Sequence, residues 1–113
     1  MAEGCIFCQI ARGEIPTKMV AHNKEMAAFR DLNPQAPVHI LIVPVKHIKS
    51  LDDVTDFDLL GRMMALATAI ARQEKISKTG YRTVINTGKD GGQSVDHLHI
   101  HLLGGREMSW PPG

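Results

Sequence analysis

The stretch that most constrains the fold of this chain is residues 94–103, where three histidines alternate with aliphatic residues. His97, His99 and His101 are each followed by a leucine or an isoleucine. This period of two is the pattern of a half-buried β-strand, on which the imidazoles share one face at intervals of roughly 6.6 Å. On a helix the same rings would point in different directions. The pattern therefore predicts a strand with one apolar face and one face of titratable rings.

The remaining elements follow from apolar periodicity and turn residues. Apolar residues at helical spacing predict a short helix over residues 5–12, and a longer stripe after Thr55 and Asp58, which are spaced as in a capping box, predicts a long helix ending near residues 75–80. The other predicted strands are residues 19–22, 26–30, 39–43 and 81–86, with turns at 23–25 and 87–93 and a proline-containing loop at 31–37. Because strands and helices do not alternate regularly, we expect an α+β fold with a mostly antiparallel sheet.

Composition limits the class of protein. A chain of 113 residues without repeats or linkers is expected to form one domain over residues 1–113. Its formal net charge of +1 gives no electrostatic reason to expect a nucleic acid or an anionic membrane as partner. No apolar run approaches 18 residues, and the start of the chain lacks a signal-peptide pattern, so we expect a cytoplasmic protein.

The histidine row admits three interpretations. Alternate residues of one flat strand fit three ligands of a single tetrahedral metal poorly. Structural histidines on a polar face are the second interpretation. Acid–base or nucleophilic catalysis is favoured, because imidazole titrates near neutrality and can attack, donate or accept.

Two further segments carry chemistry beside this row. Residues 86–94 contain three glycines, which let backbone N–H groups approach an anion, and this favours a phosphate-binding loop over a plain turn. Cys5 and Cys8 are compatible with a zinc site, a redox pair or two inert thiols, although too few residues precede them for a thioredoxin-like strand. His39 would contact the same site only if its strand neighbours the histidine strand.

Residues 97–103 resemble the signature of the histidine triad (HIT) family, and residues 31–39, 91–94 and 104–113 are similar to its nucleotide-binding (Hint) branch. The resemblance implies a five-stranded, mostly antiparallel sheet with one long and one short helix. It also implies a homodimer whose two sheets join into one of ten strands, with the tail at residues 104–113 at the interface.

The resemblance further implies a purine nucleoside phosphoramidase, which hydrolyses the P–N bond between AMP and an amine through a nucleotidyl intermediate on His99, without a catalytic cofactor. The catalytic positions that it implies are His39, Ser94, His97, His99 and His101. The nucleotide-binding positions are Ile6, Phe7, Phe29, Asp31, Leu32, Asn86, Gly92, Gln93, Ser94, His99, His101 and Trp110. Some members hold a structural zinc, and the matching residues here are Cys5, Cys8, His47 and His97.

Two other functions remain in view. One is a noncatalytic purine nucleotide-binding or interaction module, and the other is a dinucleoside polyphosphate hydrolase. The intact histidine row argues against the first, and the tail after Gly104 argues against the second.

Overall fold

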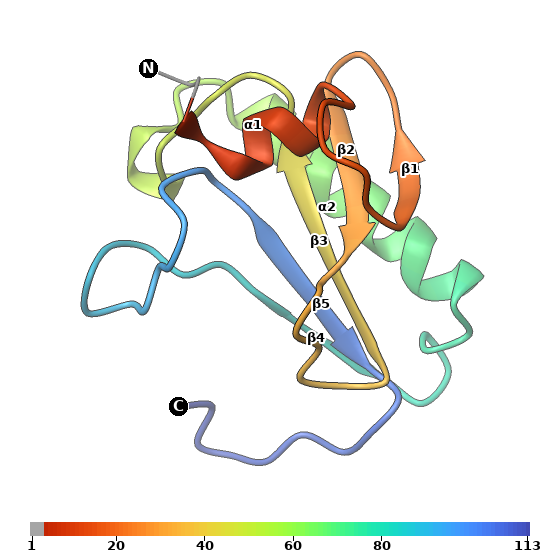
Figure 1. Ribbon diagram of the computed structural model, residues 1–113. Coiled ribbons are helices and arrows are strands. Elements are labelled where there is room, and N and C mark those ends of the chain that lie inside the picture. Colours follow the sequence, from red (N-terminus) through yellow and green to blue (C-terminus); the bar gives the residue numbers. More distant parts are fainter. Residues whose placement is uncertain (1–3) are drawn as a thin grey trace.

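A computed structural model describes residues 4–113 of the chain (Figure 1). Residues 1–3, which belong to the predicted domain and to the segment used to argue against a signal peptide, lie outside the described residues. The strands form one five-stranded sheet in the order β1-β2-β3-β5-β4, and every neighbouring pair is antiparallel. The predicted α+β class with one short and one long helix is confirmed.

The bounds of β1 and β2 agree with the prediction, and β3 is one residue longer than predicted at each end. The strands are β1 (Met19–His22), β2 (Met26–Arg30), β3 (Val38–Pro44), β4 (Tyr81–Val84) and β5 (Ile100–Gly104). Asn23 closes the β1–β2 hairpin, because its side-chain oxygen accepts from the N–H groups of Glu25 and Met26. Strand β4 is two residues shorter than predicted, and it lies at the edge of the sheet.

The two helices cover opposite faces of the sheet (Figure 1). The short helix α1 (Ile6–Ala11) packs Phe7 and Ile10 on one face, against Phe29 and Leu41. The long helix α2 (Phe57–Gln73) packs on the other, where Met63 is fully buried. Residues of β3 therefore alternate between the two clusters, with Ile40 and Ile42 under α2 and Leu41 and Val43 under α1, which explains why β3 is a continuous apolar run.

The predicted start of the long helix was wrong by one residue. Asp56, not Thr55, caps α2, since its carboxylate accepts from the N–H of Leu59 at 3.3 Å. Both residue types cap helices, and the register of the buried stripe decides between them. The helix ends at Gln73, earlier than predicted, and Glu74 then pairs with Arg30 of β2 at 2.9 Å. Within residues 4–113, neither this helix nor the other has the length and apolarity needed to cross a bilayer.

The histidine strand is shorter than predicted. Ladder pairing begins at Ile100, so His97 and His99 precede β5 and only His101 lies within it. The reason is a contact with a distant segment, because the N–H of Leu98 donates to the carbonyl of Ile48 at 2.7 Å instead of joining the ladder. The alternation itself holds: Leu98, Ile100 and Leu102 are buried in the cluster under α2.

Candidate active site

Three histidines meet on the face of the sheet that carries α1. His101 of β5 lies opposite Leu41 of β3, a residue of the cluster under α1, so its side chain shares that face. His39 lies diagonally across the same strand pair, and its ring centroid is 5.2 Å from that of His101. The centroid of His99 is 4.9 Å from that of His101. The predicted proximity of His39 to the histidine row is therefore confirmed.

The tautomer of His99 is set by a backbone carbonyl. Its Nδ1 lies 2.7 Å from the carbonyl oxygen of His97, and because a carbonyl only accepts, Nδ1 carries the proton. Burial lowers the pKa of His99, whose side chain is 3% exposed, so the ring is neutral near pH 7. Phe7 packs edge-on against the ring with centroids 5.0 Å apart. The Nε2 atom of His99 thus carries a free lone pair.

The tautomers of His39 and His101 are also determined. The N–H of Gln35 donates to Nδ1 of His39 at 3.0 Å, which places the proton of the neutral ring on Nε2. That Nε2 lies 2.9 Å from Nδ1 of His101, which therefore accepts. His101 is left with its proton on Nε2. Asp31 lies 3.4 Å from Nε2 of His39 and adds a negative charge behind this pair.

Both rings of this pair are neutral near pH 7. Burial first, and then the neighbouring imidazoles of His99 and His39, lower the pKa of His101 from 6.5 to about 4. Burial also lowers the pKa of His39, against the opposing effect of Asp31. The three rings therefore present one lone pair, on His99, and one N–H donor, on His101.

The glycine-rich loop is held by Gln93. Its Oε1 accepts from the N–H of Gly88, while its Nε2 donates to the carbonyls of Lys49 and Val95. Both N–H donors of this amide are thus used within the protein, and its oxygen accepts one hydrogen bond. The structure therefore supports a role for Gln93 in shaping the loop, and its place among the nucleotide-binding positions stays a prediction.

Fewer loop N–H groups face outward than the sequence suggested. The N–H groups of Gly92 and Gln93 donate to the carbonyls of Lys89 and Gly88. Within the part of the chain that the structure describes, neither Ser94 nor Asn86 has a side-chain partner. These two polar side chains are therefore available to a ligand.

Side chains predicted to line a nucleoside site lie on both sides of the histidines. Phe7 and Phe29 pack edge-on with centroids 5.5 Å apart, so they form part of the buried cluster. Leu32 is 84% exposed and Ile6 is 43% exposed, which leaves apolar surface available to a planar base. One hollow of about 400 Å³ is lined partly by Ile6 and Ser94, and another of about 250 Å³ partly by Asp31 and Leu32.

Cys5, Cys8, His47 and His97 form a compact cluster beside the histidine row, and their four ligand atoms all lie within 4.8 Å of one another. Nδ1 of His97 lies 3.3 Å from Sγ of Cys5 and 3.4 Å from Sγ of Cys8, while Nδ1 of His47 lies 3.2 Å from Sγ of Cys8. Tetrahedral zinc with ordinary bond lengths separates nitrogen and sulfur ligands by about 3.5 Å. The donor set and its spacing therefore fit a closed zinc site.

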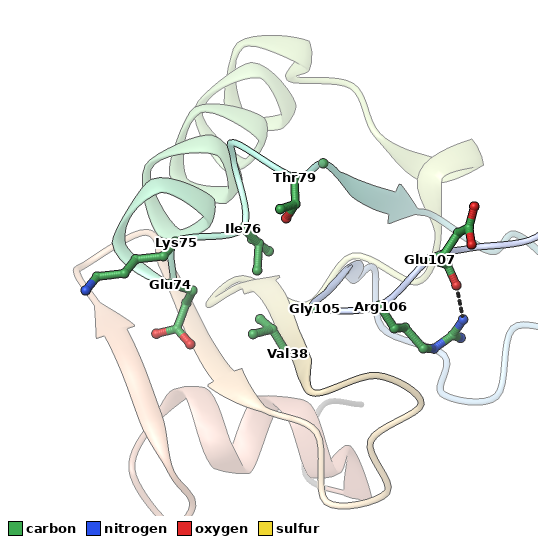
Figure 2. Close-up of a pocket in the computed structure, with 9 residues that line it drawn as sticks. Val38, Glu74, Lys75, Ile76, Thr79, Gly105, Arg106 and Glu107 are labelled. Atoms are coloured by element: carbon green, nitrogen blue, oxygen red, sulfur yellow. Dashed lines mark hydrogen bonds between the residues drawn. The ribbon is translucent and has the colours of Figure 1, made fainter.

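One further group of possible metal ligands and one large cavity are less suited to catalysis or metal binding. Asp31, His39 and His101 are also close enough to share a metal ion, but the hydrogen bond between the two rings already uses the facing nitrogens. A cavity of about 600 Å³ lies between the end of α2 and the start of the C-terminal tail (Figure 2). Its lining contains no histidine or cysteine, and its Arg106 donates to backbone carbonyls.

Trp110, which is predicted to bind nucleotide, is 80% exposed in the C-terminal tail.

Sequence reasoning missed the groups that fix the imidazole tautomers. The N–H of Gln35 and the carbonyls of His97 and Pro44 are backbone atoms, and a sequence gives no sign of where they point. A partial signal exists at Pro44, because the sequence places this residue at the end of a buried apolar run.

Comparisons of the sequence with known proteins point to one family. The model of the HIT domain family matches residues 12–108. An uncharacterised HIT-like protein of Synechococcus elongatus is 53% identical over the whole of both chains. A purine nucleoside phosphoramidase of Escherichia coli is 49% identical over 96% of this chain and 92% of that protein.

Solved structures of similar proteins point to the same family. The crystal structure of a HIT family hydrolase from Legionella pneumophila superposes with a TM-score of 0.94 at 52% identity, over 97% of this chain and all of that one. A histidine triad protein from Clostridium difficile gives a TM-score of 0.92 at 45% identity, over 95% of each chain.

Proposed function

The chain belongs to the HIT domain family, and on that premise we propose that it is a purine nucleoside phosphoramidase with His99 as its nucleophile. The observation that carries this proposal is the 2.7 Å hydrogen bond from Nδ1 of His99 to the carbonyl of His97, which leaves a lone pair on Nε2 of a buried neutral ring. The 49% identity to the phosphoramidase of Escherichia coli supports the reaction class.

The first step is an in-line displacement at the α-phosphorus of an AMP–amine conjugate. The lone pair on Nε2 of His99 forms a bond to phosphorus while the P–N bond breaks, and the electron pair of that bond leaves with the amine. The amine must take up a proton to depart. We assign the transfer of this proton to the hydroxyl of Ser94, which has no side-chain partner among residues 4–113.

Charge on the phosphoryl oxygens is met by fixed donors. The relay from Gln35 through His39 leaves His101 with an N–H at Nε2, beside the nucleophile. A neutral N–H donor that is already held in place stabilises the charged phosphoryl oxygens in the transition state without having to reorient. We assign Asn86, Gly92, Gln93 and Ser94 to the phosphate side, and Ile6, Phe7, Phe29, Asp31 and Leu32 to the nucleoside side. Trp110, which is exposed in this chain, is proposed to reach toward the site of the partner subunit.

The second step repeats the displacement with water. Water attacks phosphorus, the bond to Nε2 of His99 breaks, and AMP is released with the imidazole neutral again. The proton lost by the attacking water is taken up by the group that gave one to the amine. Two easier displacements therefore replace one hard displacement.

The decisive assay is steady-state hydrolysis of a fluorogenic adenosine phosphoramidate by wild type and His99→Ala. Wild-type turnover that is lost in the variant, with AMP binding retained in both, is the expected result. AMP binding without turnover in wild type would favour the binding module, and faster hydrolysis of diadenosine polyphosphate would favour that second enzyme.

We also infer a structural zinc ion held by Cys5, Cys8, His47 and His97, supported by the spacing of their ligand atoms. With four protein ligands the ion would keep no open position, so it would supply cross-linking between distant segments and no reaction chemistry. Metal analysis of protein purified without a histidine tag is expected to give about one equivalent per chain. Less than about a tenth of an equivalent would contradict the site.

The assembly that we propose is a homodimer of one-domain chains, residues 1–113, joined into a ten-stranded sheet. The outer edge of β4 has no neighbouring strand among residues 4–113, and such an edge is a ready template for pairing. Trp110 is exposed in the tail that follows β5, where a partner would cover it. Sedimentation is expected to give twice the chain mass, and a monomer at micromolar concentration would contradict the assembly.

A cytoplasmic location is part of the same proposal. Both cysteines are free thiols, close to two histidines and suited to metal, which is typical of a reducing compartment. Fractionation of the native cell is the measurement that tests it.

A further inference from the structure

The four-residue cluster and the nucleophile share one residue. His97 directs its ring to the cluster and its carbonyl oxygen to Nδ1 of His99. We propose that His47 and Cys8 are positioning residues for His99, which act through His97 to hold the nucleophilic lone pair toward the phosphorus. This inference rests on the proposed function and adds to it a role for the cluster in the reaction.

The ring of His97 is held at both nitrogens. Its Nε2 donates to the carbonyl of Pro44 at 2.8 Å, so Nδ1 carries the lone pair that faces the two sulfur atoms. The side chain is fully buried, with no exposed surface. The ring of His97 is therefore fixed between the end of β3 and the cluster.

The peptide unit that orients His99 is held from the same side. Its carbonyl, that of His97, accepts from His99, and its N–H, that of Leu98, donates to the carbonyl of Ile48 at 2.7 Å. Ile48 directly follows His47, whose Nδ1 lies 3.2 Å from Sγ of Cys8. A displacement of residues 47–48 would thus rotate the peptide that His99 depends on.

The sheet does not provide this support. Ladder pairing of β5 begins only at Ile100, so residues 97–99 lack the hydrogen bonds that hold a strand in register. Phe7 lies between the two cysteines in sequence and packs against the rings of both His97 and His99, with centroids 6.0 and 5.0 Å away. The cluster therefore holds both the peptide that precedes His99 and Phe7, which packs against the ring of His99.

Loss of the cluster has a defined chemical consequence. Without a fixed carbonyl, His99 can place its proton on Nε2, and that tautomer has no lone pair to form the bond to phosphorus. Of the residues proposed for the nucleoside side, only Ile6 and Phe7 lie between the two cysteines, whereas Phe29, Asp31 and Leu32 lie outside the cluster segments. The expected signature is a fall in kcat with little change in KM.

The test compares His47→Ala with His47→Cys, which keeps a metal ligand, and with His22→Ala as a control. His22 is exposed, and among residues 4–113 its ring has one hydrogen-bond partner, the carbonyl of Ala11. The readouts are metal content, kcat and KM for an adenosine phosphoramidate, and the tautomer of His99 from long-range ¹H–¹⁵N spectra. The tautomer is read without substrate and does not depend on activity.

We expect His47→Ala to lose the metal, to lower kcat by about 10- to 100-fold with KM within about threefold, and to show both His99 tautomers. His47→Cys should restore a single tautomer and most of kcat, and His22→Ala should match wild type. A metal-free His47→Ala with one tautomer and wild-type kcat would overturn the inference. If that variant does not fold, chelating the metal from folded wild type replaces it, with the same readouts and the same expected changes. Wild type without turnover would instead refute the proposed function, and the tautomer comparison would still decide this inference.

Discussion

Replacing His39 by leucine tests the histidine relay without touching the nucleophile. His39 is 6% exposed, accepts from the N–H of Gln35 at 3.0 Å and donates to Nδ1 of His101 at 2.9 Å. Leucine fills similar space but makes neither bond. Two polar groups then lose a partner, at about 1–3 kcal/mol each where water cannot replace it. Because Gln35 is exposed and its N–H can reach water, we expect a total loss of about 1–4 kcal/mol of stability.

The effect on catalysis follows from the tautomer of His101. Without a donor at Nδ1, its proton is no longer confined to Nε2, and the hydrogen bond to a phosphoryl oxygen is lost in part. A hydrogen bond to a charged group contributes about 1.5–3 kcal/mol, which corresponds to about 10- to 150-fold in kcat.

The assay is kcat for an adenosine phosphoramidate, with urea unfolding to measure stability on the same preparations. His22→Leu is the matched control, since that histidine is exposed and lies outside the relay. It should change kcat by less than about twofold. A folded His39→Leu protein with a wild-type kcat would refute the relay.

Three further predictions concern pH, the loop and the core. Burial lowers the pKa of His101 to about 4, whereas the same ring in the unfolded chain titrates near 6.5, so the unfolded state takes up the proton first as the pH falls. The free energy of unfolding should therefore fall by roughly 1–2 kcal/mol between pH 6.5 and pH 4, after allowance for solvent screening at this half-buried ring. His101→Gln should show a smaller loss in urea melts across that window, and an equal loss would count against the assignment. A Cβ on Gly91 would collide with the carbonyl oxygen of Thr87, so Gly91→Ala should distort the loop and lower kcat/KM. Gly61→Ala, on open helix surface, should instead raise stability by about 0.5–1 kcal/mol. Equal kcat/KM for the two alanine variants would contradict the role of the loop. Met63 is fully buried, so Met63→Ala should cost about 2–5 kcal/mol in thermal or urea unfolding, and a cost below about 1 kcal/mol would contradict its place in the core.

Much of the sheet could be predicted because its pattern is local. Alternation in residues 97–102 and the apolar run of β3 each assign side chains to faces without knowledge of the neighbours. The start of the histidine strand was mispredicted because its first residues pair with Ile48 instead of β3, which is a contact across 50 residues. Local propensity carries no information about such a contact.

In the candidate site, too, some features could be predicted from the sequence and others depend on distant contacts. The side chains of His39, His99 and His101 could be picked from the sequence, but their tautomers depend on backbone atoms of Gln35 and His97. The cluster of two cysteines and two histidines joins segments up to 92 residues apart, so spacing alone leaves zinc and inert thiols equally open. The resemblance implies Gln93 as a nucleotide-binding position, and nothing in the sequence indicates that its amide also holds the loop through Gly88, Lys49 and Val95.

The claim that His99 forms a covalent nucleotidyl intermediate is tested most directly by stereochemistry at phosphorus. One diastereomer of an adenosine phosphorothioamidate is hydrolysed in ¹⁸O-labelled water, and the configuration of the product is determined. Each in-line displacement inverts phosphorus, so two steps through Nε2 of His99 predict overall retention. Overall inversion would mean that water attacks the substrate directly, and it would contradict the nucleophilic role of His99.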